Sequence, residues 1–400
     1  MKRLIYISLF FIFIPASNAQ ESDDLYCKGA AYMQMGRYDE AINYLTSAIK
    51  LSPGSARLYF KRGKAYYKSD SLNKAMRDFQ ETNALNESLA DLWISKTYAR
   101  LGNNDESLSY LKSHLKSGYR MNEKVIRKDD AYNDLQYSDE WYMLWQGNWY
   151  TNEEETIKEV DYMVKKEMYL DALVLLDEKI PESKYVYKLY ACRAKVNEKL
   201  NNYKGAVEDW SIAISIENRI IKYYVERGNA YFELGKFKDA INDFTKALRQ
   251  EPAEFTLYIK RAKAYAKLKE YKPALRDVVT YLKYFEHDQE AIALCGNLHY
   301  LNENYIEALK YFNKNLSLDK SNPEYYKDRG RTYLKSKTYK YAISDLSMAL
   351  DLSPNDGETY FLLGIACFET EDMEGACYNW KEAKKKGDYR AIEYLLEHCE

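Results

Sequence analysis

Apolar residues recur along most of this chain at intervals of three and four residues, which is the pattern of helices that bury one face. The patterned stretches come in pairs, and a short turn separates the two members of each pair. In the pair that begins at Ile221, the first stretch places Tyr224 and Gly228 on one face, and the second does the same with Ala240 and Phe244. The pattern therefore predicts an all-α protein built from antiparallel helix pairs.

Small residues repeat along the chain at a fixed interval. Alanine recurs every 34 residues at Ala206, Ala240, Ala274, Ala308, Ala342 and Ala376. Twelve residues before each of them lies a second small residue, at Ala194, Gly228, Ala262, Gly296, Gly330 and Gly364. The same combination occurs near the start of the chain, as Gly29 with Ala41 and Gly63 with Ala75. Because small side chains let two helices approach closely, this period predicts helix pairs that nest against each other.

The residues of one repeating unit fall at offsets that match a known family. They are a bulky aromatic residue, Gly, Tyr, Ala, a second aromatic residue, Ala and Pro, at Tyr224, Gly228, Tyr231, Ala240, Phe244, Ala247 and Pro252. In these positions the unit resembles a tetratricopeptide repeat. The same register gives about ten repeats, which begin near Ser22, Ala56, Ser88, Glu153, Tyr187, Ile221, Phe255, Gln289, Pro323 and Gly357. The resemblance implies a tetratricopeptide solenoid, a right-handed α–α superhelix of stacked helix pairs.

The match is interrupted once and weakened in three places. Repeat 3 has Ser107 where Ala is expected, repeat 4 is degenerate before Tyr169, and repeat 8 has His299 in a Tyr position. Residues 118–152 have a helical pattern without the pair of small residues, and they resemble the capping segment that often closes a group of such repeats. The expected segments are a signal peptide at 1–19, three repeats at 20–117, a capping insert at 118–152, seven repeats at 153–386 and a capping helix at 387–400.

Three tryptophans stand four residues apart near the end of the insert. Trp141, Trp145 and Trp149 share one helix face if the helix extends that far. One interpretation is that they cover the exposed end of the first three repeats, because the terminal units of an array need caps. The alternative is an aromatic platform that binds a glycan or a similar small molecule.

Two charged positions vary together when the repeats are compared. Counted from the first residue of each repeat, five repeats have Arg at position 7, and the same five have Asp at position 23. The pairs are Arg62 with Asp78, Arg193 with Asp209, Arg227 with Asp243, Arg261 with Asp277 and Arg329 with Asp345. A guanidinium group can donate two parallel hydrogen bonds to one carboxylate. We therefore predict that each pair bridges the two helices of one repeat and is structural.

The first residues have the pattern of a secretory signal. Lys2 and Arg3 form a charged start, residues 4–14 are apolar, and Ser17 and Ala19 place small side chains before a cleavage site. The apolar run has eleven residues, whereas about 20 are needed to span a bilayer. We expect an exported protein, periplasmic or secreted, with no integral membrane segment after cleavage; an uncleaved anchor is the alternative.

The balance of charged residues bears on whether the partner is a nucleic acid. The chain has 59 Lys and Arg residues against 61 Asp and Glu residues, a formal charge of −2. This balance lacks the basic excess that is typical of nucleic-acid binders, so no nucleic-acid partner is expected. Tyrosine is unusually frequent, with 41 residues, and many of them share positions 4, 11 and 17 of the repeats, where we expect them to pack between helices.

Residues suited to catalysis or metal binding are scarce. No two histidines stand four residues apart, and no H-E-x-x-H or C-x-x-C motif occurs. No glycine-rich phosphate loop and no G-x-S-x-G motif is present either. The sequence therefore predicts a protein that is not an enzyme and has no metal site and no cofactor.

The six cysteines suggest one disulfide. Cys377 and Cys399 lie close enough in sequence to meet at the C-terminal cap, and an oxidising compartment would favour a bond between them. The other four cysteines lie in separate repeats, where small buried thiols are expected.

The family resemblance also implies which side chains line the concave groove. Positions 2, 5, 9, 12 and 13 of each repeat should face inward. The candidate groove residues are Arg57, Phe60, Lys64, Tyr67, Lys68, Lys195, Asn229, Phe232, Lys263 and Lys267. They suggest an extended peptide held by side-chain fit and steered by charge; the alternative is a merely solvated helix surface. The carboxylate-clamp pattern best known in the family is not reproduced.

Together these patterns favour a non-enzymatic scaffold or adaptor that binds a peptide or partner protein in an extracytoplasmic compartment. Two other hypotheses remain open at this point. One is a ligand-binding protein that uses the Trp141, Trp145 and Trp149 face. The other is an extracytoplasmic co-chaperone that holds unfolded proteins.

Overall fold

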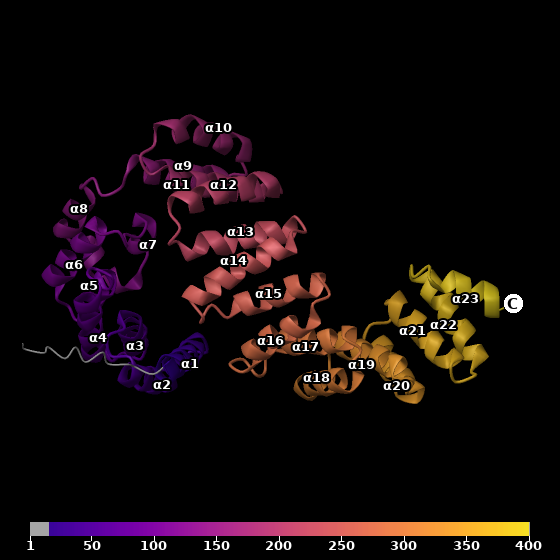
Figure 1. Ribbon diagram of the computed structural model, residues 1–400. Coiled ribbons are helices and arrows are strands. Elements are labelled where there is room, and N and C mark those ends of the chain that lie inside the picture. Colours follow the sequence, from indigo (N-terminus) through magenta and orange to yellow (C-terminus); the bar gives the residue numbers. More distant parts are fainter. Residues whose placement is uncertain (1–15, 400) are drawn as a thin grey trace, which may run out of the picture. The chain divides into compact units, whose positions relative to one another are not determined.

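The computed structural model describes residues 16–399, and every regular element within that range is a helix (Figure 1). The all-α prediction is therefore confirmed. Residues 1–15 of the expected signal peptide lie outside the described residues. Within residues 16–399, no helix is both long and apolar enough to cross a bilayer.

The described chain divides into two compact units between Leu189 and Tyr190. The helices of the first unit are α1 Ala16–Gln34, α2 Tyr38–Leu51, α3 Ala56–Lys68, α4 Leu72–Leu85, α5 Asp91–Arg100, α6 Asn104–Lys116, α7 Glu123–Arg127, α8 Asp139–Trp145, α9 Asn152–Lys165 and α10 Tyr169–Lys179. It also contains three 3-10 helices, η1 Asp130–Tyr132, η2 Leu135–Tyr137 and η3 Ile180–Glu182. The pair α9–α10, which the sequence groups with the later repeats, thus belongs to the first unit.

The second unit consists of further helix pairs. Helix α11, Val186–Lys199, contains the boundary between the units, and the helices that follow are α12 Tyr203–Ile216, α13 Ile221–Glu233, α14 Phe237–Gln250, α15 Thr256–Lys267, α16 Tyr271–Leu282, α17 Gln289–Leu301, α18 Tyr305–Leu318, α19 Pro323–Lys335, α20 Tyr339–Leu352, α21 Gly357–Phe368, α22 Met373–Lys385 and α23 Ala391–His398. Within each unit paired helices pack on each other, as α1 does on α2 and α13 on α14, and neighbouring pairs are in contact from α1 to α6 and from α12 to α22.

The turn inside each repeat has one backbone conformation throughout the array. The residue at position 15 is left-handed in all ten repeats, with φ between 56° and 77°: Gly36, Asp70, Gly102, Glu167, Asn201, Gly235, Lys269, Glu303, Lys337 and Glu371. In repeat 6 this conformation lets the amide of Lys236 donate to the carbonyl of Tyr231 at 2.9 Å, which closes the end of α13. The degenerate repeat 4 turns in the same way, at Glu167. The backbone of repeat 4 therefore has the same turn as the other repeats, although its side chains differ from the repeat pattern.

Small residues at position 8 allow the close approach within a pair. A Cβ atom added to Gly228 would lie 2.7 Å from Cε1 of Phe244, whose ring is buried on α14. The same relation holds between Gly63 and Phe79 in repeat 2. The residue at position 24 thus fills the space that a larger side chain at position 8 would take.

We expect Gly228→Val to lower the free energy of unfolding by about 1–3 kcal/mol, because an overpacked core must shift the Phe244 ring or separate the helices. Chemical denaturation followed by circular dichroism measures this loss. Gly54→Val is the matched control, since a Cβ atom at Gly54 would meet nothing within 4 Å. Equal losses in the two variants would contradict the packing explanation.

The predicted Arg–Asp pairs are in contact in the structure. Arg227 donates from Nε to Asp243 Oδ2 and from Nη2 to Asp243 Oδ1, both at 2.8 Å. The same two-bond geometry joins Arg62 to Asp78, Arg193 to Asp209, Arg261 to Asp277 and Arg329 to Asp345. Each bond pair links the first helix of a repeat to its second helix.

The third donor of these arginines reaches the preceding repeat. Nη1 of Arg227 donates to Ser211 Oγ at 3.1 Å. The equivalent partners at position 25 of the preceding repeat are Thr46 for Arg62, Thr245 for Arg261 and Asn313 for Arg329. One guanidinium group therefore holds both helices of its own repeat and the second helix of the one before it.

Tyrosines at positions 4 and 11 enclose the same guanidinium groups. The guanidinium carbon of Arg227 lies 5.7 Å from the ring centroids of both Tyr224 and Tyr231. Arg62 and Arg329 lie between equivalent tyrosine pairs. These rings are mostly half-buried. Some of the many tyrosines therefore make cation–π contacts with arginine instead of filling an apolar core.

The insert at 118–152 forms short helices where the sequence suggested a longer helical pattern. Only α7, α8, η1 and η2 lie within it, because Asp129 and Ser138 accept hydrogen bonds from the amides that follow them and start new short helices. Tyr132 and Trp141 are buried in one cluster with Leu92 of α5. The insert thus packs its apolar residues on the third repeat.

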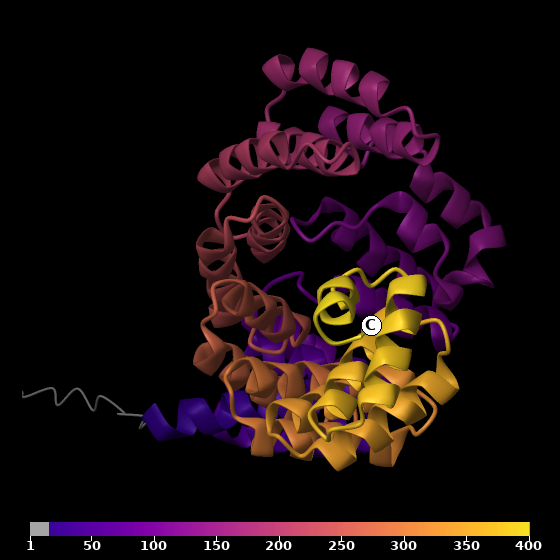
Figure 2. The same cartoon turned by 90° about the vertical axis from the view of Figure 1, so that its right-hand side faces the viewer.

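The C-terminal helix α23 is attached both by packing and by a covalent bond. The ring centroid of Tyr394 lies 4.9 Å from that of Trp380 and 5.4 Å from that of Phe361. A disulfide joins Cys377 of α22 to Cys399, with Cα atoms 5.7 Å apart. Helices α21, α22 and α23 share one hydrophobic cluster and lie side by side in both views (Figures 1 and 2). The remaining cysteines are buried, at Cys27, Cys192, Cys295 and Cys367.

Candidate peptide-binding surface

The first unit has a basic cavity between its second and third repeats and the insert. The cavity has a volume of about 420 Å³. Its lining comes from α3, α5 and the segment after α7, and consists of Tyr67, Lys68, Trp93, Lys96, Arg100, Lys128, Asp129, Asp130 and Ala131. Four cationic side chains thus face two carboxylates. A cavity with this surplus of positive charge favours an anionic ligand.

A cluster of aromatic rings and ammonium groups adjoins this cavity. Lys64 Nζ lies 4.1 Å from the ring centroid of Phe60 and 4.8 Å from that of Trp93. Lys96 Nζ lies 4.7 Å from the Trp93 centroid and 2.6 Å from Asp129 Oδ2. Burial, followed by the charges of Lys61 and Lys96, lowers the pKa of Lys64 to about 8.

A smaller cavity lies between repeats 6 and 7 of the second unit. Its volume is about 340 Å³, and it is lined by Asn229, Phe232, Glu233, Phe244, Lys260 and Lys263. Lys260 Nζ donates to Asn229 Oδ1 at 2.9 Å and so links position 6 of one repeat to position 9 of the previous one. The aromatic wall and the polar rim suit one side chain of a bound peptide.

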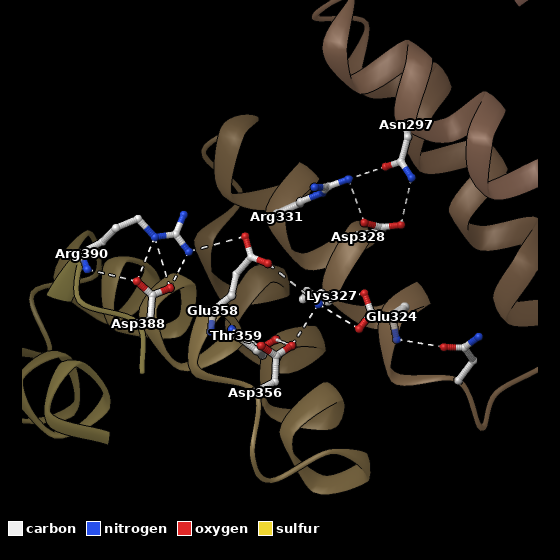
Figure 3. Close-up of polar contacts among 11 residues, drawn as sticks. Asn297, Glu324, Lys327, Asp328, Arg331, Asp356, Glu358, Thr359, Asp388 and Arg390 are labelled. Carbon is white, nitrogen blue, oxygen red and sulfur yellow. Dashed lines mark hydrogen bonds and ion pairs between the residues drawn. The ribbon is translucent and has the colours of Figure 1, made fainter. Parts of the chain in front are cut away.

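A third cavity of about 520 Å³ lies at the C-terminal end of the second unit. Its lining is Tyr300, Arg331, Leu334, Lys335, Lys337, Tyr339, Glu358, Phe361, Leu362, Ile365, Glu369, Arg390 and Tyr394. Neighbouring acidic or amide groups hold two of its cations (Figure 3): Arg331 binds Asn297 and Asp328, and Arg390 binds Asp388. This cavity has the same surplus of two cations as the first, and its wall adds the aliphatic side chains of Leu334, Leu362 and Ile365.

Asp328 is the buried anion of the network in Figure 3. Its carboxylate lies 2.8 Å from Nη2 of Arg331 and accepts from Nδ2 of Asn297 at 3.3 Å. Burial raises the pKa of Asp328, and Arg331 opposes that rise. Nearby, Lys327 lies 2.8 Å from Glu324 and 3.0 Å from Asp356. These contacts hold α17, α19 and α21 in register.

The candidate groove residues fall into three groups. Tyr67, Lys68, Asn229, Phe232 and Lys263 line the cavities described above. Lys64 lies beside the first cavity through its contact with Trp93, and Phe60 contacts Lys64. Arg57 is paired with Asp23 at 2.7 Å, and Lys195 and Lys267 are exposed outside these cavities.

Several residues that line the first cavity are not among the candidates from the sequence. Lys96 and Arg100 occupy positions 9 and 13 of repeat 3, which are the positions of Lys64 and Lys68 in repeat 2. The positional rule could therefore have found them. Trp93 and Lys128 lie outside those positions, and their place depends on the packing of the insert.

The three tryptophans of the insert do not form one exposed face. Helix α8 ends at Trp145, so Trp149 lies beyond it and donates from Nε1 to the carbonyl of Leu144 at 2.6 Å. Trp141 is only 3% exposed and lies against Trp145, with ring centroids 5.5 Å apart. The interpretation as an aromatic platform for a glycan is therefore wrong for Trp141, which is a core residue.

Within residues 16–399, no three His, Cys, Asp or Glu residues are grouped so that they could hold a metal ion. The described cavities present ammonium, guanidinium, carboxylate, amide and aromatic groups. Such groups can form hydrogen bonds and packing contacts with a ligand.

Comparison with known proteins agrees with the helix-pair geometry. The sequence profile of the family described as TPR repeat matches residues 29–70 and 228–269, one segment in each unit. These are tetratricopeptide repeats. The helix pairs outside the two matched segments share the 34-residue period and the position-15 turn.

Relatives share the tetratricopeptide repeat over short segments. Human tetratricopeptide repeat protein 13 is 40% identical over 84 residues, which are 20% of this chain and 10% of that protein. Hsc70-interacting protein 1 of Drosophila melanogaster is 37% identical over 71 residues, 18% of this chain and 19% of that protein. The alignments thus cover less than a fifth of each relative.

A solved structure supports the tetratricopeptide fold over a longer range. The C-terminal part of a TPR repeat-containing protein from Cytophaga hutchinsonii aligns with 60% of this chain and 99% of that structure. The TM-score is 0.51 and the sequence identity is 17%. This likeness concerns the fold alone.

Proposed function

We propose that this protein is a non-enzymatic scaffold that binds partner proteins on the surface formed by the first helices of its repeats. The observation that carries the proposal is the recurrence of cavities on that surface, at α3–α5, α13–α15 and α19–α23. Tetratricopeptide repeats generally mediate protein–protein interactions. Aromatic rings beside unpaired cations are suited to hold an extended peptide.

We further propose that the scaffold works outside the cytoplasm. The charged and apolar pattern of residues 1–19 is typical of an export signal. The bond between Cys377 and Cys399 also fits this proposal, because structural disulfides persist in oxidising compartments.

Capture from living cells tests the scaffold function. The full chain with a C-terminal affinity tag is cross-linked in its own compartment, and the retained proteins are identified by mass spectrometry. Reversing the charge of Lys64 and Lys68 to glutamate should remove at least one retained protein, because both cations lie at the first cavity. Reversing Lys74 and Arg77, which are exposed on the second helix of the same repeat, is the matched control.

Two results would count against the proposal. One is that the native chain retains no protein at moderate salt. The other is that both double variants retain the same set as the native chain, which would mean that binding occurs on another surface. Retention of many unfolded proteins by the native chain would instead favour the co-chaperone, a function suggested by the short match to an Hsc70-interacting protein.

A further inference from the structure

Lys64 is a partly buried cation of the first unit whose charge is not compensated. Its ammonium group lies over the rings of Phe60 and Trp93. In residues 16–399 no carboxylate lies within ion-pair distance of it, and the charged groups that face it are Lys61 on its own helix and Lys96 on α5. Burying an ammonium group beside like charges costs stability, and a nearby anion would offset that cost.

Three neighbouring cations differ from Lys64 because each is paired with a carboxylate of the same chain. Arg57 is paired with Asp23 at 2.7 Å, Lys96 with Asp129 at 2.6 Å and Arg100 with Asp70 at 2.5 Å. An anionic ligand would have to displace an internal carboxylate to reach any of these. At Lys64 it would displace no internal carboxylate.

Two further cations near Trp93 also have no ion-pair partner in the described chain. Lys68, Lys128 and Trp93 all line the 420 Å³ cavity. The ring of Trp93 also contacts the ammonium group of Lys64. The three ammonium groups therefore lie around one tryptophan. An extended polypeptide repeats its side chains on one face about every 7 Å, so one strand can present several carboxylates to such a cluster.

We propose that the first unit binds a polypeptide segment rich in glutamate or aspartate, with one carboxylate paired to Lys64 and its neighbours at Lys68 and Lys128. The inference rests on the proposed scaffold function and gives the chemistry of the partner at this site. The Trp93 ring then lies beneath the bound segment and limits the access of water to the Lys64 ion pair.

Protonation of Lys64 gives the interaction a pH dependence. In the free protein the pKa of Lys64 is lowered to about 8, so the amine is charged at pH 7 and mostly neutral at pH 9. A bound carboxylate favours the charged form and raises that pKa. Linkage then requires affinity to fall as pH rises through 8, by about tenfold between pH 7 and pH 9.

The test uses two labelled peptides of twelve residues and the full chain. One peptide alternates glutamate with serine, the other alternates glutamine with serine, and both have a neutral dye for fluorescence anisotropy at 0.15 M salt. We expect the glutamate peptide to bind at least tenfold more tightly than the glutamine peptide at pH 7. Lys64→Met should remove most of that difference, while Lys74→Met on the outer helix leaves it unchanged.

Lys64→Arg separates the role of the charge from a structural effect. Arginine stays charged at pH 9, so this variant should bind the glutamate peptide at pH 7 and keep its affinity at pH 9. Equal binding of the two peptides, or a native pH profile that Lys64→Arg reproduces, would overturn the inference. Capture of partners that depends on Lys68 but not on Lys64 would leave the scaffold function standing and reject the acidic partner alone.

Discussion

Replacing Asp243 with alanine should lower the free energy of unfolding of the second unit by about 3–5 kcal/mol, because the change leaves a largely buried guanidinium group without its anion. The side chain of Arg227 is 18% exposed and that of Asp243 is 7% exposed, so water can replace little of the lost interaction. Urea denaturation of the full chain measures the loss, and hydrogen exchange locates it at α13 and α14.

A matched variant distinguishes this effect from a general loss of acidic residues. Asp239 lies on the same helix, is exposed and has no Arg partner at position 7, so Asp239→Ala should change stability by less than about 0.5 kcal/mol. Combining Asp243→Ala with Arg227→Met should recover part of the stability, since it removes the unpaired charge. A loss that stays below 1 kcal/mol in Asp243→Ala would show that the pair is not structural.

Removing the disulfide should destabilise the C-terminal cap by about 3 kcal/mol by the chain-entropy estimate for a loop of this size. The two cysteines are 22 residues apart, and Cys399 follows directly after α23. In Cys377→Ser with Cys399→Ser, amides of α23 should exchange faster while those of α13 keep their rates. The measurement is hydrogen exchange with mass spectrometry.

The reduced native protein provides the control for that comparison. Reductant should reproduce the exchange of the double variant in α23 and have no further effect on the double variant itself. If α23 exchanges at the same rate with and without the bond, its packing through Tyr394 alone holds the cap. Alkylation of Cys377 without reductant in protein taken from cells would contradict the proposed oxidising compartment.

The repeat geometry could be predicted because its determinants are local and periodic. The small residue at Gly228 and the pair Arg227–Asp243 recur at constant register, so comparison of the repeats predicts a contact across 16 residues. The position-15 turn was harder to predict. Glycine indicates it at Gly235, but Lys269 and Glu303 adopt the same left-handed backbone without a side chain that favours it, because the packing of the two helices imposes the turn.

The candidate site could be predicted only in part, for a related reason. Lys64 and Lys68 follow from their positions in the repeat, but the cavity beside them is completed by Lys128 and Asp129 of the insert. The insert has no period, so its place against α5 depends on long-range packing of Tyr132 and Trp141. The charge balance at Lys64 likewise depends on which neighbours the other cations bind.

The arginine bridge between repeats is absent at some junctions of the second unit. Where α16 meets α17, position 25 is Val279 and position 7 is Cys295, so no guanidinium group joins these repeats, whereas Ser211 with Arg227 and Asn313 with Arg329 join theirs. A chain stretched between its ends should therefore lengthen in steps rather than one helix pair at a time. The early steps should separate helix pairs at junctions without the bridge, such as α16 from α17, while the bridged repeats stay folded.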